Sequence, residues 1–142
     1  MINSPLLGPV VALVAWSLVM MTWMAAKRLP AMKKAGVTPK RGGRGQDLEG
    51  VLAPEANWPA HNYAHLMEQP TIFYAIVFAL ILMGMDVPIN LWLAWGYVAL
   101  RVVHSIVQAT VNTVQIRFPL FLLSSLCLLG LTVHAAARLV HG

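Results

Sequence analysis

Five polar side chains recur at helical spacing inside an otherwise apolar stretch in the second half of the chain. They are Arg101, His104, Gln108, Asn112 and Gln115. At about 100° per residue, these positions fall within roughly 80° of arc, so one face of the helix is polar. An ionisable group facing lipid is costly, and such groups usually point into a bundle, a cavity or a partner. We therefore expect this polar stripe to carry function.

A second set of chemically active residues lies just before the middle of the chain. His61, His65 and Glu68 follow one another at spacings of four and three residues, which places them on one face of a continuous helix. A carboxylate isolated in hydrocarbon needs a partner or a proton. If the two helices run antiparallel, Arg101 and His104 reach a similar depth. We expect Glu68 to form a buried contact with Arg101 or His104.

Composition places these residues in a membrane protein. Of the 142 residues, 58% are hydrophobic and only 11% are charged, whereas soluble domains contain about 25% charged residues. Residues 6–26 and 118–137 contain no Asp, Glu, Lys or Arg, and each run is long enough to cross a bilayer as a helix. Two further apolar segments become long enough when they are extended through the polar stretches. The sequence predicts an all-α, integral membrane four-helix bundle.

We expect a single domain over residues 1–142. The helices are predicted at about residues 6–27, 60–85, 89–115 and 117–139, and a long segment of about 28–59 connects the first two. Seven of the ten Lys and Arg residues lie in this connection or at the end of the first helix, so the positive-inside rule assigns the connection to the cytoplasm. The net charge of +5 therefore indicates topology and does not indicate a nucleic-acid partner.

The motifs of the two middle helices resemble the MAPEG superfamily, the membrane-associated proteins in eicosanoid and glutathione metabolism, and in particular its small bacterial members. The first motif reads Asn62-x-x-His65-Leu66-x-Glu68-x-Pro70-x-x-Phe73-Tyr74. The second reads Arg101-x-x-His104-Ser105 and is followed by Asn112 and Arg117. Two such motifs in this order, on the expected helices, identify the chain as a MAPEG-like transmembrane domain.

This resemblance implies a homotrimer, with glutathione as co-substrate bound between neighbouring subunits near the cytoplasmic face. It also implies a glutathione-dependent transferase or peroxidase that acts on lipophilic electrophiles or hydroperoxides. Arg117 is the candidate catalytic residue, because it matches the family's arginine for the glutathione thiolate and a guanidinium favours a thiolate over a thiol. The candidate substrate-binding residues are His61, His65, Glu68, Arg101, His104 and Gln108.

Several positions depart from the eicosanoid-metabolising relatives. His61, His65 and Gln108 stand where those relatives have Arg, Asn and Tyr, respectively. Phe118 and Phe121 stand where those enzymes tend to have hydroxyl groups. We therefore expect weaker binding of glutathione, or a preference for another polar ligand.

Two alternatives stay open. A noncatalytic membrane trimer, either lipid-binding or accessory, would keep the fold with a degenerate pocket. His61, His65, Glu68 and His104 could instead hold iron or zinc, although a second carboxylate is lacking and we expect no metal site. The expected partners are further copies of the chain, the bilayer and a lipophilic small molecule, without nucleic acid. The expected location is the bacterial inner membrane, with residues 28–59 in the cytoplasm.

Overall fold

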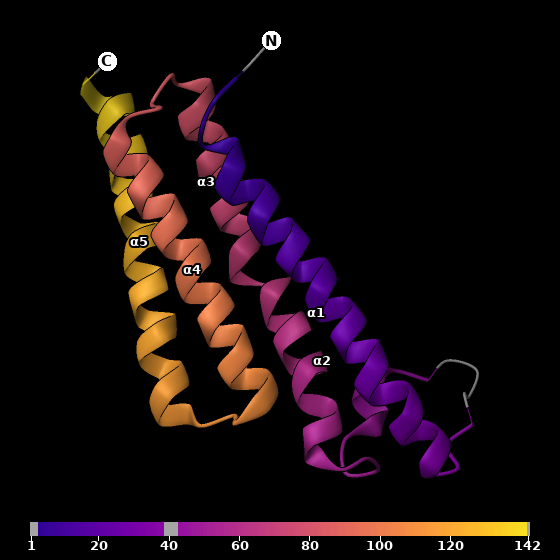
Figure 1. The fold of residues 1–142 in the computed structure, drawn as a ribbon. Helices are drawn as coiled ribbons and strands as arrows, with labels where there is room; N and C mark the ends of the chain where they lie inside the picture. Colours follow the sequence, from indigo (N-terminus) through magenta and orange to yellow (C-terminus); the bar gives the residue numbers. More distant parts are fainter. Residues whose placement is uncertain (1–2, 39–42, 142) are drawn as a thin grey trace.

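The computed structural model describes residues 3–38 and 43–141, and helices form most of this part of the chain. The elements are α1 (Leu7–Lys34), the short 3-10 helix η1 (Gly45–Leu48), α2 (Pro54–Leu66), α3 (Gln69–Leu82), α4 (Pro88–Thr110) and α5 (Val114–His141). Figure 1 shows α2 and α3 end to end as one interrupted rod, so the five α-helices of the described residues form four rods. The described residues contain no strand, which confirms the predicted all-α class.

Both termini lie at one end of the bundle, together with the connection between α3 and α4 (Figure 1). Hydrogen bonds join the segments that meet there. The Ser4 hydroxyl donates to Asp86 Oδ1 at 2.6 Å, and His134 Nδ1 lies 2.6 Å from Asn90 Oδ1. The connections from α1 to α2 and from α4 to α5 lie at the opposite end, which we call the loop end.

Three of the four rods are long and apolar enough to cross a membrane, namely α1, the combined rod Pro54–Leu82 and α5. The fourth, α4, spans 23 residues, or roughly 35 Å of helix. Its polar stripe distinguishes it from the other three rods. Arg101, His104 and Gln108 on this stripe are buried, whereas Val103 and Ile106 on the opposite face are exposed. These three residues therefore point into the bundle, as their spacing predicts. The predicted continuous stripe to Gln115 is wrong, because α4 ends at Thr110, Asn112 lies in the turn and Gln115 is exposed on α5.

The helices next to the long connection extend further than the sequence predicts. The first helix continues to Lys34 instead of ending near residue 27, and α2 begins at Pro54 instead of near residue 60. Lys33 and Lys34 in the last turn of α1 are favourable beside the negative end of the helix dipole. Proline at the first position of α2 lacks only an N–H that would have no helical partner. Lys40 and Arg41, two of the basic residues between these helices, lie outside the described residues.

A break between α2 and α3 is the main departure from the expected helix over residues 60–85. Pro70 cannot donate a helical hydrogen bond, and its ring would clash with the carbonyl four residues earlier. The chain leaves helical geometry at Glu68, whose φ and ψ are −90° and −96°. The continuous helix that the predicted shared face of His61, His65 and Glu68 requires is therefore interrupted at Glu68.

A polar contact joins three helices inside the apolar core just beyond this break. The Tyr97 hydroxyl donates to Gln69 Oε1 at 3.2 Å, and Gln69 Nε2 donates to Ser125 Oγ at 2.9 Å. The Tyr97 ring also stacks on Phe73, with ring centroids 4.3 Å apart. Gln69 thus connects α3 to both α4 and α5.

The connection between α1 and α2 is held to the bundle by Arg28 and Asn57. Arg28 Nε donates to Asn57 Oδ1 at 3.1 Å, and Arg28 Nη2 donates to the Gly45 carbonyl at 3.2 Å. Asn57 Nδ2 in turn donates to the Leu48 carbonyl at 3.1 Å. Because Asn57 is buried, these bonds fix η1 against the ends of both helices.

We predict that Asn57→Ala loosens this connection. The substitution removes two hydrogen bonds at a buried position, for which a loss of about 1–3 kcal/mol is expected. Limited proteolysis in detergent should cleave the connection faster, and the melting temperature should fall. Gln46→Ala, at an exposed position on η1, is the matched control and should leave both measurements unchanged. Equal cleavage rates for the two variants would contradict the assignment of Asn57 as the anchor.

Candidate functional site

A pocket of about 190 Å³ lies at the loop end of the bundle. Its walls come from three helices, with His65 from α2, His104 from α4 and Arg117 from α5. The remaining lining residues, all from α5, are Val114, Phe118 and Phe121. The structure thus brings together three candidate site residues that lie far apart in the sequence.

The two pocket histidines contact each other through their rings. The imidazoles of His65 and His104 meet edge to face with centroids 5.3 Å apart, and the Phe121 ring lies 5.5 Å from that of His65. Each imidazole nitrogen can donate or accept a hydrogen bond according to its protonation. The pocket therefore combines proton-transferring groups with an aromatic wall.

Arg101 lies behind the histidines and fixes the backbone that carries one of them. Its Nη2 donates to the His65 carbonyl at 3.3 Å. The centre of its guanidinium lies 5.9 Å from the Tyr97 ring centroid and 5.6 Å from that of Phe121, within the range of cation–π attraction. With only 1% of its surface exposed, Arg101 is the largest fully buried side chain of the described chain.

The turn before α5 positions Arg117. Asn112 has a positive φ of 54°, a conformation that asparagine tolerates better than most residues. Its Oδ1 accepts a hydrogen bond from Arg117 Nη1. The Nε atom of Arg117 is buried and has no hydrogen-bond partner in the described part of the chain. The guanidinium is thus held on one side while a donor stays available on another.

Several buried polar atoms of α2 and α4 lack a hydrogen-bond partner among the residues that the structure describes. They are Asn62 Nδ2, His65 Nδ1, Arg101 Nε and Nη1, Ser105 Oγ and Gln108 Oε1. Buried polar atoms are normally paired, so a cluster of this kind needs a physical explanation. Of these five residues, only His65 lines the pocket.

The expected buried contact of Glu68 with Arg101 or His104 is wrong. The Glu68 side chain is 72% exposed, and its Oε2 lies 3.4 Å from His65 Nδ1. The prediction assumed a continuous helix through Glu68, and the chain leaves helical geometry at this residue. Arg101 is instead held by the His65 carbonyl and by aromatic rings.

His61 and Gln108 lie outside the pocket lining. His61 is exposed, and its Nε2 lies 2.6 Å from Glu49 Oε1 in the connection after α1. Gln108 is buried on α4, one turn beyond His104. Sequence reasoning missed Glu49 and Asn57 as partners of the two helices, because an irregular connection has no periodicity from which to predict its contacts.

The alternative metal site finds no support in the geometry. Within residues 3–38 and 43–141, no group of three or more His, Cys, Asp or Glu side chains is arranged to hold a metal ion. One of the four proposed ligands, His61, contacts Glu49 instead of lying beside His65 and His104.

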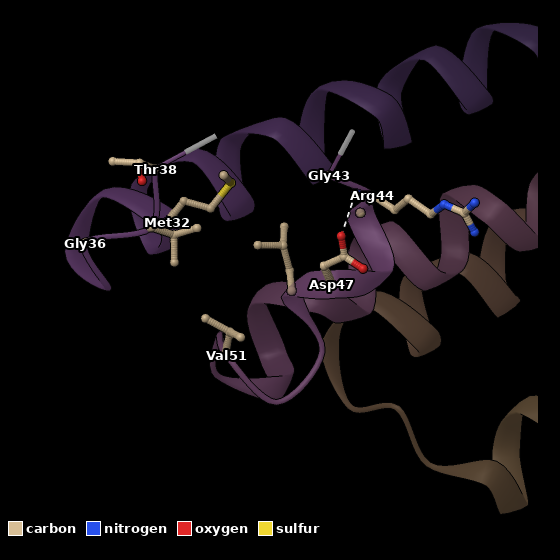
Figure 2. A pocket seen from close by; sticks show the side chains of 10 residues that line it. Met32, Gly36, Thr38, Gly43, Arg44, Asp47 and Val51 are labelled. Atoms are coloured by element: carbon tan, nitrogen blue, oxygen red, sulfur yellow. Dashed lines mark hydrogen bonds between the residues drawn. The ribbon is translucent and has the colours of Figure 1, made fainter. Parts of the chain in front are cut away.

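A larger cavity of about 500 Å³ lies between the end of α1 and η1, away from the candidate site residues. Figure 2 shows Met32 and Val51 in its wall, and the side chain of Arg44 extends away from it. Asp47 Oδ2 accepts a hydrogen bond from the Arg44 backbone N–H at 2.8 Å, so this carboxylate is already engaged. We assign no binding role to this cavity, because none of the candidate site residues lines it.

The family comparison decides the class of this protein. The MAPEG family model matches residues 6–137, nearly the whole chain. The chain belongs to the MAPEG family. This result confirms the resemblance seen in the two motifs, and with the three apolar helices it supports an integral membrane protein. Neither the curated proteins nor the solved structures include a match.

Neighbouring positions of this MAPEG chain should differ sharply in their effect on stability. We predict that Gln69→Ala lowers the free energy of unfolding by about 1–2 kcal/mol, because two hydrogen bonds between membrane helices are lost. Glu68→Ala should change it by less than about 0.5 kcal/mol, because its side chain is largely exposed. Reversible unfolding in mixed micelles measures both values. If Glu68→Ala lowered the free energy of unfolding more than Gln69→Ala, Glu68 would make the buried contact that the structure excludes.

Proposed function

We propose that this protein is a glutathione-dependent transferase or peroxidase of the membrane, acting on lipophilic electrophiles or hydroperoxides. One observation carries the proposal: Arg117 meets His65 and His104 in a single pocket in a chain of the MAPEG family. The family is associated with glutathione metabolism, and the pocket supplies the cation that thiol chemistry requires.

Arg117 would act on the sulfur. A thiol of ordinary pKa is mostly protonated at neutral pH, and a neighbouring guanidinium lowers that pKa by favouring the thiolate. Asn112 holds one side of the guanidinium, so the charge is fixed in place before a substrate enters. An electrophile dissolved in the bilayer would reach the thiolate at the end of the bundle.

The buried polar atoms around the pocket would hold the rest of the tripeptide. Arg101 has two N–H groups without partners, which suit a carboxylate, and Gln108 offers an unpaired acceptor for an amide N–H. His65, His104 and Glu68 would complete the binding surface around them. His61, exposed and paired with Glu49, would contact a ligand only at the mouth of the site.

We further propose a homotrimer in which a neighbouring subunit completes the pocket. The cavity of about 190 Å³ is smaller than the roughly 300–1,000 Å³ of typical ligand pockets, so one subunit encloses only part of a tripeptide. Exposed apolar side chains along the helices leave surface for both lipid and further copies of the chain. The basic residues around the first connection support a cytoplasmic loop end and a location in the bacterial inner membrane.

Glutathione binding and turnover test this function directly. Purified protein in detergent should bind glutathione and catalyse its reaction with an aryl halide or a lipophilic hydroperoxide. Arg117→Ala should lower kcat by about 10- to 100-fold, because each unit of thiol pKa corresponds to about tenfold in thiolate stabilisation. Binding should weaken by a smaller factor, since the rest of the tripeptide keeps its contacts.

Arg138→Ala provides the matched control, because Arg138 is an exposed arginine at the opposite end of the same helix. Its activity should equal that of the wild-type protein. If millimolar glutathione neither binds nor supports turnover, the enzymatic function is wrong and the noncatalytic membrane trimer replaces it.

A further inference from the structure

One pocket histidine contacts a carboxylate as well as the pocket. His65 lines the cavity with its ring, and its Nδ1 is buried 3.4 Å from Glu68 Oε2. We propose that His65 is the general base that removes the thiol proton, and that Glu68 stabilises the imidazolium formed. This inference rests on the proposed glutathione chemistry and assigns the proton acceptor within it.

The site needs a proton acceptor in addition to Arg117. A guanidinium can stabilise a thiolate but cannot accept a proton, because it is already protonated at any physiological pH. A neutral imidazole can accept one through the lone pair of its unprotonated ring nitrogen. The pairing of a thiol with a base that a third group orients is the recurrent arrangement of activated nucleophiles.

The surroundings favour His65 over His104 as this base. Four ionisable groups face His65: Glu68 from the adjacent turn, Arg101 and His104 from α4, and Arg117 from across the pocket. Only Glu68 among them can compensate a positive charge on the ring. No carboxylate oxygen of the described residues lies within ion-pair distance of His104, so a proton there would add to the two nearby cations without compensation.

The structure also fixes the ring in a useful orientation. Arg101 anchors the His65 carbonyl at 3.3 Å, while Phe121 packs 5.5 Å from the imidazole. Because Nδ1 faces Glu68, we assign its hydrogen to that side, which leaves the Nε2 lone pair for the pocket. Glu68 is thus a positioning residue, whereas His65 would touch the thiol.

The reaction balances without a further reagent when the electrophile is an aryl halide. The S–H proton moves to His65 Nε2, and the electron pair of the broken bond stays on sulfur beside Arg117. Sulfur then forms a bond to the ring carbon, and the halide leaves with its bonding electrons. The imidazolium returns its proton to water, so the net products are the thioether and the hydrogen halide.

The pH dependence of kcat/KM separates this role from a structural one. For the wild-type protein we expect kcat/KM to rise with pH as the His65 imidazole loses its proton, and then to level off. For His65→Asn the rise should continue to higher pH, where free thiols ionise. At pH 6.5 the variant should be about 100-fold slower, with the difference shrinking as the pH approaches 9.

Companion variants complete the test. Glu68→Gln keeps the size of the side chain but removes its charge, and it should give an intermediate rate with the inflection of the profile shifted to lower pH. His141→Asn, at an exposed position beyond the core, should behave as the wild-type protein. His65→Gln is a second replacement, should His65→Asn fail to fold as judged by its elution profile and melting temperature.

The amount of bound thiolate, measured by its ultraviolet absorbance, distinguishes a failure of the His65 assignment from a failure of the proposed glutathione function. If wild-type protein forms thiolate and both His65 variants keep the wild-type pH profile, His65 is not the base, although the glutathione function stands. If wild-type protein forms no thiolate and has no turnover, both the proposed function and the assignment of His65 as the base are wrong. If the wild-type protein forms thiolate and the His65 variants form it only at higher pH, the assignment of His65 as the base is supported.

Discussion

The burial of the Arg101 guanidinium inside an apolar bundle constrains the rest of the site. A charge on a membrane helix has to find polar or aromatic partners within the protein, because lipid offers none. Arg101 finds them in the His65 carbonyl and in the rings of Tyr97 and Phe121. These partners belong to α2, α4 and α5, so holding this one cation fixes three helices relative to one another. The face of α4 that carries Arg101 also carries His104, whose ring contacts that of His65 at the loop end.

Two local departures from regular helix then shape the site. The chain leaves helical geometry at Glu68, just before Pro70, and the exposed Glu68 carboxylate lies 3.4 Å from His65 Nδ1. The left-handed residue Asn112 reverses the chain after α4, and its side chain holds Arg117. His65 thus has the Glu68 carboxylate near one ring nitrogen and lines the same pocket as the Arg117 cation. In the proposed chemistry, Arg117 stabilises the thiolate and His65 accepts its proton.

The sequence contained enough information to predict the fold class and the inward polar face of α4, because helical periodicity and apolar length are local properties. The motifs also predicted Arg117, His65 and His104 as site residues, and the structure brings these three into one pocket. The position of Glu68 could not be predicted from spacing, since spacing assumes a continuous helix and the proline breaks it. The partnership of His61 with Glu49 depends on how an irregular connection folds back, and no periodic pattern encodes that contact.

The central claim is that polar groups from α2, α4 and α5 form a ligand site at the loop end of this MAPEG protein. An experimental structure determined in lipid with glutathione present tests it most directly. We predict elongated density that places sulfur beside the Arg117 guanidinium, within hydrogen-bonding reach of the His65 ring. Density at another part of the bundle would contradict the account, as would a pocket filled by its own side chains at saturating glutathione.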